Sequence, residues 1–143
     1  FGARGALFGI TRGTTAAHVV RAVLEGVAQR GADLLEAVLS DSGLEVARLC
    51  VDGGMSANGV FVQALADATA REVVLAPVTE ATTLGAAFLS GTAVGLWPSL
   101  EDAARTSPPR AIVAPRRSFD RERWREIRSR AAGWVPELSS LDF

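Results

Sequence analysis

Apolar residues recur at steps of three and four along the stretch that follows a glycine-rich opening. Residues 1–13 carry glycines between short apolar groups, which is typical of a loop. The recurring pattern then predicts a helix of about seven turns. A hydroxyl at Thr14 or Thr15 can accept hydrogen bonds from the first turn, and Gly43 suits the left-handed position that ends a helix. The apolar stripe of this helix consists of Val20, Val23, Leu24, Val27, Leu34, Leu35 and Val38.

Two short apolar runs in the middle of the chain predict strands. Residues 46–51 predict a buried strand, and residues 72–75 predict a second strand, which Pro77 ends. A helical pattern follows each run. This alternation predicts an α/β fold with parallel strands and helices packed on the sheet. Two strands make a small sheet, so we expect the rest of it to lie outside this chain.

The two helices that follow these strands have different characters. The first is expected to start near Ser56, with Val60, Phe61, Ala64, Leu65 and Ala68 on one face. The second is expected over residues 83–95, capped by Thr79 or Thr82. Its small residues, Gly85, Ala86, Ala87 and Gly91, allow close packing.

Shorter and more charged segments follow Pro98. Ser99 and Asp102 have the spacing of a capping motif for a short helix. Residues 107–109 predict a linker, and a charged helix is expected from Ser118 to about residue 132. This last helix places Trp124, Ile127 and Ala131 on one side.

Composition excludes several classes of protein. The chain has 143 residues, of which 48% are hydrophobic, so it can form the core of one domain and is not disordered. Fifteen basic and sixteen acidic residues give a net charge of −1, so overall charge does not favour binding to nucleic acid or to an anionic membrane. No apolar run approaches the ~20 residues of a membrane span. Every basic residue is arginine, which excludes a Walker A loop and a Schiff-base lysine.

Cysteine and histidine are too scarce for a zinc cluster. Cys50 is the single cysteine, and His18 is the single histidine. A lone cysteine forms no internal disulfide, which suits a reducing compartment, so we expect a cytoplasmic protein. We assign no metal-ligating residue in this chain. The chain starts with Phe1 and lacks a signal-peptide pattern, which we interpret as a cut inside a longer chain.

The segment from Asp52 to Asn58 is the most informative local feature. It follows a predicted parallel strand, at the edge where open α/β sheets bind ligands. Gly53 and Gly54 let a ligand approach the backbone, and the following helix offers free N–H groups. Asn58 carries both a donor and an acceptor, which could read an adenine edge. A Gly-Gly turn is also explained by the turn alone, because turns need glycine whatever they bind.

Other polar residues have structural explanations beside functional ones. Asp52 could be a catalytic carboxylate, but it has no visible partner and suits a turn cap. His18 is expected to be a neutral, hydrogen-bonding residue near the start of its helix. Arg21 and Glu25 are four residues apart and can pair. The arginines between residues 116 and 130 alternate with acids, which favours a solvated helix face over a nucleic-acid patch.

Several strings of the chain resemble the C-terminal signature of the FGGY family of carbohydrate kinases. They are residues 3–14, 18–25, 51–58 and 83–97, in consistent order over roughly residues 1–135. Within the family they are most similar to the members that phosphorylate glycerol. Another FGGY sugar kinase, for a pentulose or a hexonate, and a non-catalytic actin-like scaffold module are the alternatives.

The resemblance implies a fold, a reaction and a site. Residues 1–135 would be part of the second, nucleotide-binding domain of an actin-like (ribonuclease H-like) ATPase fold, and residues 136–143 a C-terminal tail. The full enzyme would transfer the γ-phosphoryl of ATP, with Mg²⁺, to a glycerol hydroxyl and release ADP. Gly54 and Asn58 fall on the family's adenine-nucleotide contacts, and Gly53 flanks them. The resemblance also implies a homo-oligomer.

The chain is shorter than the family pattern. The resemblance places the catalytic aspartate, the glycerol pocket and the phosphate-gripping Gly-Thr loop outside these residues. Phosphoryl transfer depends on positioning and charge stabilisation around the reacting phosphate. We therefore assign no catalytic residue, and expect the isolated chain to be inactive and to bind ATP weakly. An exposed sheet edge and exposed apolar surface are expected as well.

Overall fold

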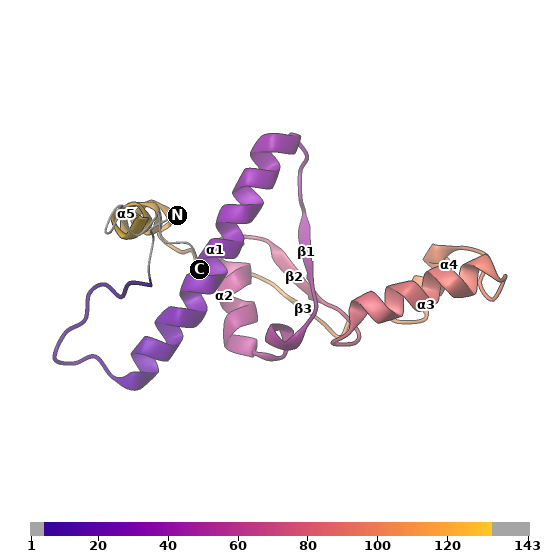
Figure 1. Cartoon of the computed structure of the whole chain (residues 1–143), viewed down its shortest axis with the longest axis horizontal. Helices are drawn as coiled ribbons and strands as arrows, with labels where there is room; N and C mark the ends of the chain where they lie inside the picture. The colour runs from indigo at the N-terminus through magenta and orange to yellow at the C-terminus, as the bar shows by residue number, and fades with distance from the viewer. Residues whose placement is uncertain (1–4, 133–143) are drawn as a thin grey trace, which may run out of the picture. The chain divides into compact units, whose positions relative to one another are not determined.

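The computed structural model describes residues 5–132 (Figure 1). The chain forms two compact units, which are described separately. One unit comprises residues 24–118 and contains the sheet. The other combines described residues 5–23 with 119–132.

Helix α1 (Ala16–Ser42) confirms the predicted long helix and both of its ends. Thr15 caps it: its Oγ1 accepts the His18 N–H at 3.4 Å, and His18 Nδ1 accepts the Thr15 N–H at 3.2 Å. This is the reciprocal pattern of a capping box, with histidine at the position usually taken by glutamate or glutamine. Gly43 ends the helix with φ +65°.

Most of the predicted apolar stripe of α1 is exposed. Val20, Val23, Val27, Leu34 and Val38 are exposed, whereas Leu35 and the smaller Ala28 and Ala32 are buried. Small residues bring α1 close to its neighbour: a Cβ on Gly31 would lie 2.8 Å from Leu65 Cδ1. Close approach selects small side chains, so the larger apolar residues of the pattern fall on the solvent side.

The sheet has three strands in the order β1-β2-β3. They are β1 (Arg48–Val51), β2 (Glu72–Leu75) and β3 (Ala111–Val113). The predicted parallel pairing of β1 with β2 is confirmed, and β2 has the predicted bounds. β3 pairs antiparallel with β2 and was not predicted, because three residues are too few to show a period. The sheet is therefore mixed, within the predicted α/β class.

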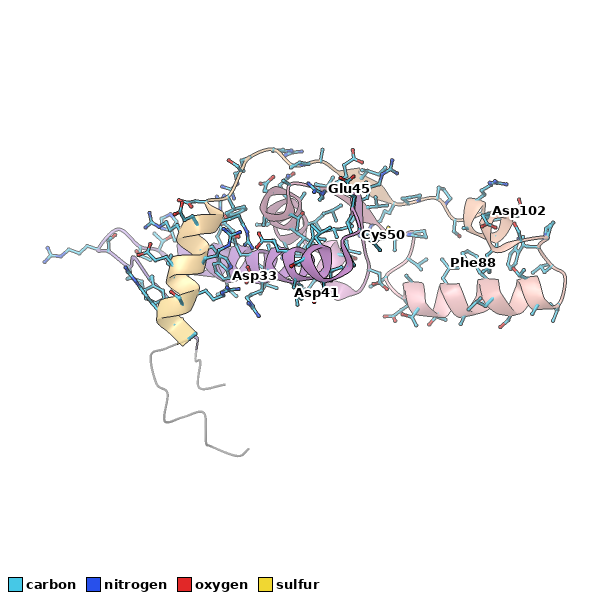
Figure 2. The ribbon with its side chains drawn as sticks, turned by 90° about the horizontal axis from the view of Figure 1, so that it is seen from above. Asp33, Asp41, Glu45, Cys50, Phe88 and Asp102 are labelled. Atoms are coloured by element: carbon cyan, nitrogen blue, oxygen red, sulfur yellow. The ribbon has the colours of Figure 1, made fainter. Side chains whose placement is uncertain are left out.

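Strand β1 lies at an edge of this sheet and is not buried as predicted. Arg48 and Cys50 are exposed, and Leu49 and Val51 are half-buried. Figure 2 marks Cys50 on this strand, where it is a free cysteine. Within residues 5–132 no strand pairs with the outer edge of β1, which confirms the expected exposed edge.

Helix α2 (Gly59–Thr69) packs beside β2 and β3 (Figure 1). It begins later than predicted because a short 3-10 helix, η1 (Gly54–Ala57), comes first. Leu65, Ala64 and Ala68 are buried as expected, but Val60 is exposed and Val62 is buried in its place. Val62 and Val73 of β2 are the largest fully buried side chains, so the core lies between this helix and the sheet.

Two further helices pack on each other. They are α3 (Ala81–Ala93) and α4 (Leu100–Arg105). The predicted Ser99 cap is confirmed, since its Oγ accepts the Asp102 N–H at 3.1 Å. The predicted threonine caps of α3 are wrong: its N-cap is Glu80, which makes no side-chain cap hydrogen bond. Phe88 of α3 meets the Trp97 ring edge to face at 5.6 Å (Figure 2).

Helix α5 (Arg121–Ala132) begins after the predicted Ser118, and none of its residues is buried. This confirms the expected solvated helix. The predicted tail at residues 136–143 lies outside the described residues. Within residues 5–132, no helix is both long enough and apolar enough to cross a membrane.

Candidate functional site

The segment from Asp52 to Asn58 joins the carboxyl end of β1 to α2. Because β1 and β2 are parallel, with Val51 opposite Leu75, the segments that follow both strands lie at one edge of the sheet. A hydrogen bond ties these two segments together: the Gly53 N–H donates to the Thr79 carbonyl at 3.0 Å. The candidate site is therefore at the carboxyl edge of parallel strands, as predicted.

Gly53 is required by the backbone of this turn. Its dihedral angles are φ 78° and ψ 176°, a region that is essentially restricted to glycine. Its carbonyl accepts the Ser56 N–H at 3.0 Å and the Ser56 Oγ–H at 2.7 Å. Ser56 is buried, so this pair fixes the turn from the protein side.

Arg110 supports the same turn from a distant part of the chain. Its Nη2 donates to the Ser56 carbonyl at 2.9 Å, across 54 residues of sequence. Its own N–H donates to the Leu75 carbonyl at 3.0 Å, which places it beside the end of β2. Sequence reasoning missed Ser56 and Arg110 as supports, because no local pattern connects residue 110 to this turn.

Gly54 presents an open backbone surface. The residue is exposed, and a Cβ built on it would meet no atom within 4 Å. A flat group can therefore lie against the main chain here without displacing any side chain.

Asn58 is the N-cap of α2, which narrows its predicted role. Its Oδ1 accepts the Val60 N–H at 3.0 Å and the Phe61 N–H at 3.2 Å. The acceptor is therefore committed to the helix. The Nδ2 amide makes no hydrogen bond to any residue in the described range, so the donor is what Asn58 offers to a ligand.

Of the other polar residues singled out from the sequence, His18 and Glu25 have structural partners, and the side chain of Asp52 does not contact another polar group of the described residues. His18 is the hydrogen-bonding histidine that was expected, through its reciprocal cap with Thr15. Glu25 pairs with Arg117, whose Nη2 lies 2.6 Å from its Oε1. The side chain of Asp52 is exposed and makes no hydrogen bond or ion pair with the residues that the structure describes. The same part of the chain contains no group of three or more His, Cys, Asp or Glu side chains that could hold a metal ion.

Comparison with known proteins identifies the family. Residues 2–94 match the model of the C-terminal domain of the FGGY family of carbohydrate kinases. The chain belongs to this family. Its sequence is similar to glycerol kinases: 41% identical over 140 residues to that of Clostridium beijerinckii and 45% over 137 residues to that of Deinococcus radiodurans. These matches cover 94% and 92% of the chain, but only 28% and 27% of the relatives.

Solved structures of FGGY kinases share the fold. The glycerol kinase of Plasmodium falciparum with ADP matches with a TM-score of 0.73 and 28% identity, over 99% of this chain and 28% of that one. A xylulose kinase of Lactobacillus acidophilus matches with a TM-score of 0.78 at 21% identity, over 96% of this chain and 29% of that one. The second likeness shows the fold alone. Together they confirm the predicted actin-like α/β fold.

Proposed function

We propose that this chain provides the adenosine side of the nucleotide cleft in a cytoplasmic glycerol kinase. The complete enzyme would transfer the γ-phosphoryl of ATP to a glycerol hydroxyl, giving glycerol 3-phosphate and ADP. The observation that carries the proposal is the open backbone of Gly54 beside the unengaged Asn58 amide, at the carboxyl edge of two parallel strands. The similarity to glycerol kinases supports glycerol over a pentulose or a hexonate as the acceptor.

Each residue of the turn has a definable task toward adenosine. Gly54 offers a surface without a side chain, against which the purine and ribose can lie. Asn58 Nδ2 donates to a ring nitrogen, while its Oδ1 holds the helix. Gly53, fixed by Ser56, keeps the turn in the conformation that exposes both groups. ATP, when bound, supplies the phosphoryl group that is transferred.

The described residues contribute to binding and not to the reacting centre. They hold no cluster of three metal-ligating side chains, so we derive no step through Mg²⁺ from this chain. The chain also spans little more than a quarter of its curated relatives. We therefore propose that the isolated chain does not phosphorylate glycerol, and that it binds nucleotide weakly.

The proposal is tested by titrating the isotope-labelled 143-residue chain with ADP and following backbone amides by NMR. The amides of Gly54 and Asn58 are expected to shift saturably. Asn58→Asp separates the two functions of this side chain, because aspartate caps a helix as well as asparagine but has no amide donor. This variant should keep the melting temperature and bind ADP about tenfold more weakly, as expected for one lost hydrogen bond. Asn58→Ser is a neutral second variant with the same expectation.

Gly54→Ala tests whether ADP lies against the Gly54 backbone, and Gly26→Ala is its matched control. Neither added methyl group meets an atom within 4 Å, so both variants should fold. Only Gly54→Ala is expected to weaken ADP binding. If ADP shifts none of residues 53–58, or if Gly54→Ala and Asn58→Asp bind ADP as well as the unchanged chain, the proposed site is wrong. A coupled assay with ATP and glycerol should show no turnover by the isolated chain.

A further inference from the structure

A hollow within residues 24–118 borders the candidate turn, whose Ser56 and Ala57 form part of its lining. Its volume is about 480 Å³, within the range of roughly 300–1,000 Å³ typical of small-molecule sites. Its apolar wall is formed by Val62, Leu75 and Val113. Arg110, Arg116 and Gln63 line it with polar groups. None of Gly53, Gly54 and Asn58 is among its lining residues.

Arg110 is anchored by hydrogen bonds that use only some of its N–H donors. Its N–H and its Nη2 are anchored by the carbonyls of Leu75 and Ser56. No described residue accepts a hydrogen bond from its Nε or Nη1. A guanidinium carries five N–H donors in a planar fork, so Arg110 keeps several of them for a ligand.

Arg116 is fixed through its backbone and has an unpaired side chain. Its N–H donates to Asp67 Oδ1 at 2.7 Å, and the buried carboxylate of Asp67 holds this backbone in place. The Arg116 guanidinium makes no hydrogen bond or ion pair with any residue of the range 5–132. Both arginines therefore start from anchored main-chain positions, which lowers the entropy cost of gripping a ligand.

The hollow contains positive charge without a compensating acid. No Asp or Glu is among its lining residues. The neighbouring carboxylate, Asp67, is already committed to Gln63, Arg117 and two backbone N–H groups. Gly59, the first residue of α2, also lines the hollow, and it adds the positive end of a helix dipole.

We infer that this hollow binds a small oxyanion-bearing molecule, through a phosphate or carboxylate group held between Arg110 and Arg116. Guanidinium forks match the geometry of both groups, because each presents two oxygens to two parallel N–H donors. The wall of Val62, Leu75 and Val113 accommodates a short carbon skeleton behind the anion. The volume suits a metabolite, and the net charge of −1 gives no support for a nucleic acid.

The test titrates the labelled 143-residue chain with inorganic pyrophosphate and, separately, with citrate. The Gly59 amide and the Gln63 side-chain amide are expected to shift saturably with at least one probe. Pyrophosphate alone would identify a phosphate site, and citrate alone a carboxylate site. Arg116→Gln should weaken binding about tenfold, as expected for a lost charge-assisted contact, and Arg110→Gln should do the same.

Arg105→Gln is the matched control, because it removes the same charge from an exposed arginine outside the hollow. It should leave the affinity unchanged. Equal losses in Arg105→Gln and Arg116→Gln would show attraction by overall charge only and would overturn the inference. Absence of saturable shifts with both probes would overturn it as well. Neither probe contains adenosine, and the proposed adenosine contacts Gly54 and Asn58 do not line the hollow, so either proposal can fail while the other holds.

Discussion

Asp67 and Arg117 form an ion pair, with 3.1 Å between Oδ2 and Nε, although they are fifty residues apart in sequence. Only 1% of the Asp67 side chain is exposed. Its carboxylate also accepts hydrogen bonds from the Arg116 N–H and from Gln63 Nε2. Arg117 forms a second ion pair, with Glu25. One buried carboxylate therefore ties α2 to the segment after β3, and through Arg117 to α1.

Asp67→Asn should destabilise the chain strongly. The variant replaces the acceptor of several charge-assisted hydrogen bonds by a neutral amide, and removal of one partner of a buried ion pair costs roughly 3–5 kcal/mol. We expect a loss of about 2–4 kcal/mol in the free energy of unfolding, measured by urea titration. Glu126→Gln, which breaks the exposed pair with Arg130, should change it by less than about 1 kcal/mol. Similar midpoints for the two variants would contradict this account.

The same carboxyl makes stability depend on pH in the acid range. Burial alone would raise the pKa of Asp67, but hydrogen bonds from the Arg116 N–H, Gln63 and Arg117 outweigh it and hold the pKa below its usual value. A lowered folded-state pKa stabilises the fold above the unfolded pKa of about 3.9, and this contribution is lost as pH falls through the folded value. The stability difference between the unchanged chain and Asp67→Asn should therefore be constant near neutral pH. It should shrink below about pH 4 in urea titrations at successive pH values. A difference that grows on acidification would show the opposite sign.

Alanine should act differently at the two glycines of the candidate turn. Gly53 has φ +78°, so Gly53→Ala is expected to cost about 1–3 kcal/mol of folding free energy through backbone strain. Gly54 has no positive φ and an open Cβ position, so Gly54→Ala should cost less than about 0.5 kcal/mol. Thermal unfolding of both variants checks this. A Gly54→Ala variant that melts as early as Gly53→Ala would mean that the Gly54 surface is packed.

Helix α3 offers a second glycine pair. A Cβ on Gly91 would clash with Cζ3 of Trp97, which belongs to a rigid aromatic ring. Gly91→Ala should therefore lower the melting temperature, at a cost of about 1–3 kcal/mol for overpacking. Gly85→Ala, in the same helix with nothing within 4 Å, should gain roughly 0.5–1 kcal/mol from helix propensity. Equal effects at both positions would refute the close contact with Trp97.

Local chemistry explains which elements were predictable. The bounds of β2 follow from an apolar run that Pro77 closes, and the Ser99 cap follows from hydrogen bonding within one turn. The parallel pairing of β1 and β2 follows from the intervening helix, which leaves no room for a hairpin. In each case the interactions that decide the structure lie within a few residues, or within one strand–helix–strand unit.

Features that depend on distant residues were not predictable. β3 forms because β2 offers it a partner, and three residues show no period of their own. Arg110 supports the Ser56 turn, and Asp67 anchors Arg117, across more than 45 residues in each case. For the candidate site, the sequence predicted the location of Gly54 and Asn58 at the strand edge. The sequence did not reveal that Asn58 Oδ1 caps α2, because this role depends on the residue at which the helix begins.

The outer edge of β1 has a consequence for the behaviour of this polypeptide in concentrated solution. Among residues 5–132 no strand pairs with the main-chain groups of this edge, which also carries the exposed Cys50, so extended segments of other molecules can add to it. We therefore expect these 143 residues to self-associate at high concentration through this edge. A fused peptide segment that pairs with Arg48–Val51 as an additional strand should reduce this association. Reducing conditions should prevent disulfide formation through Cys50.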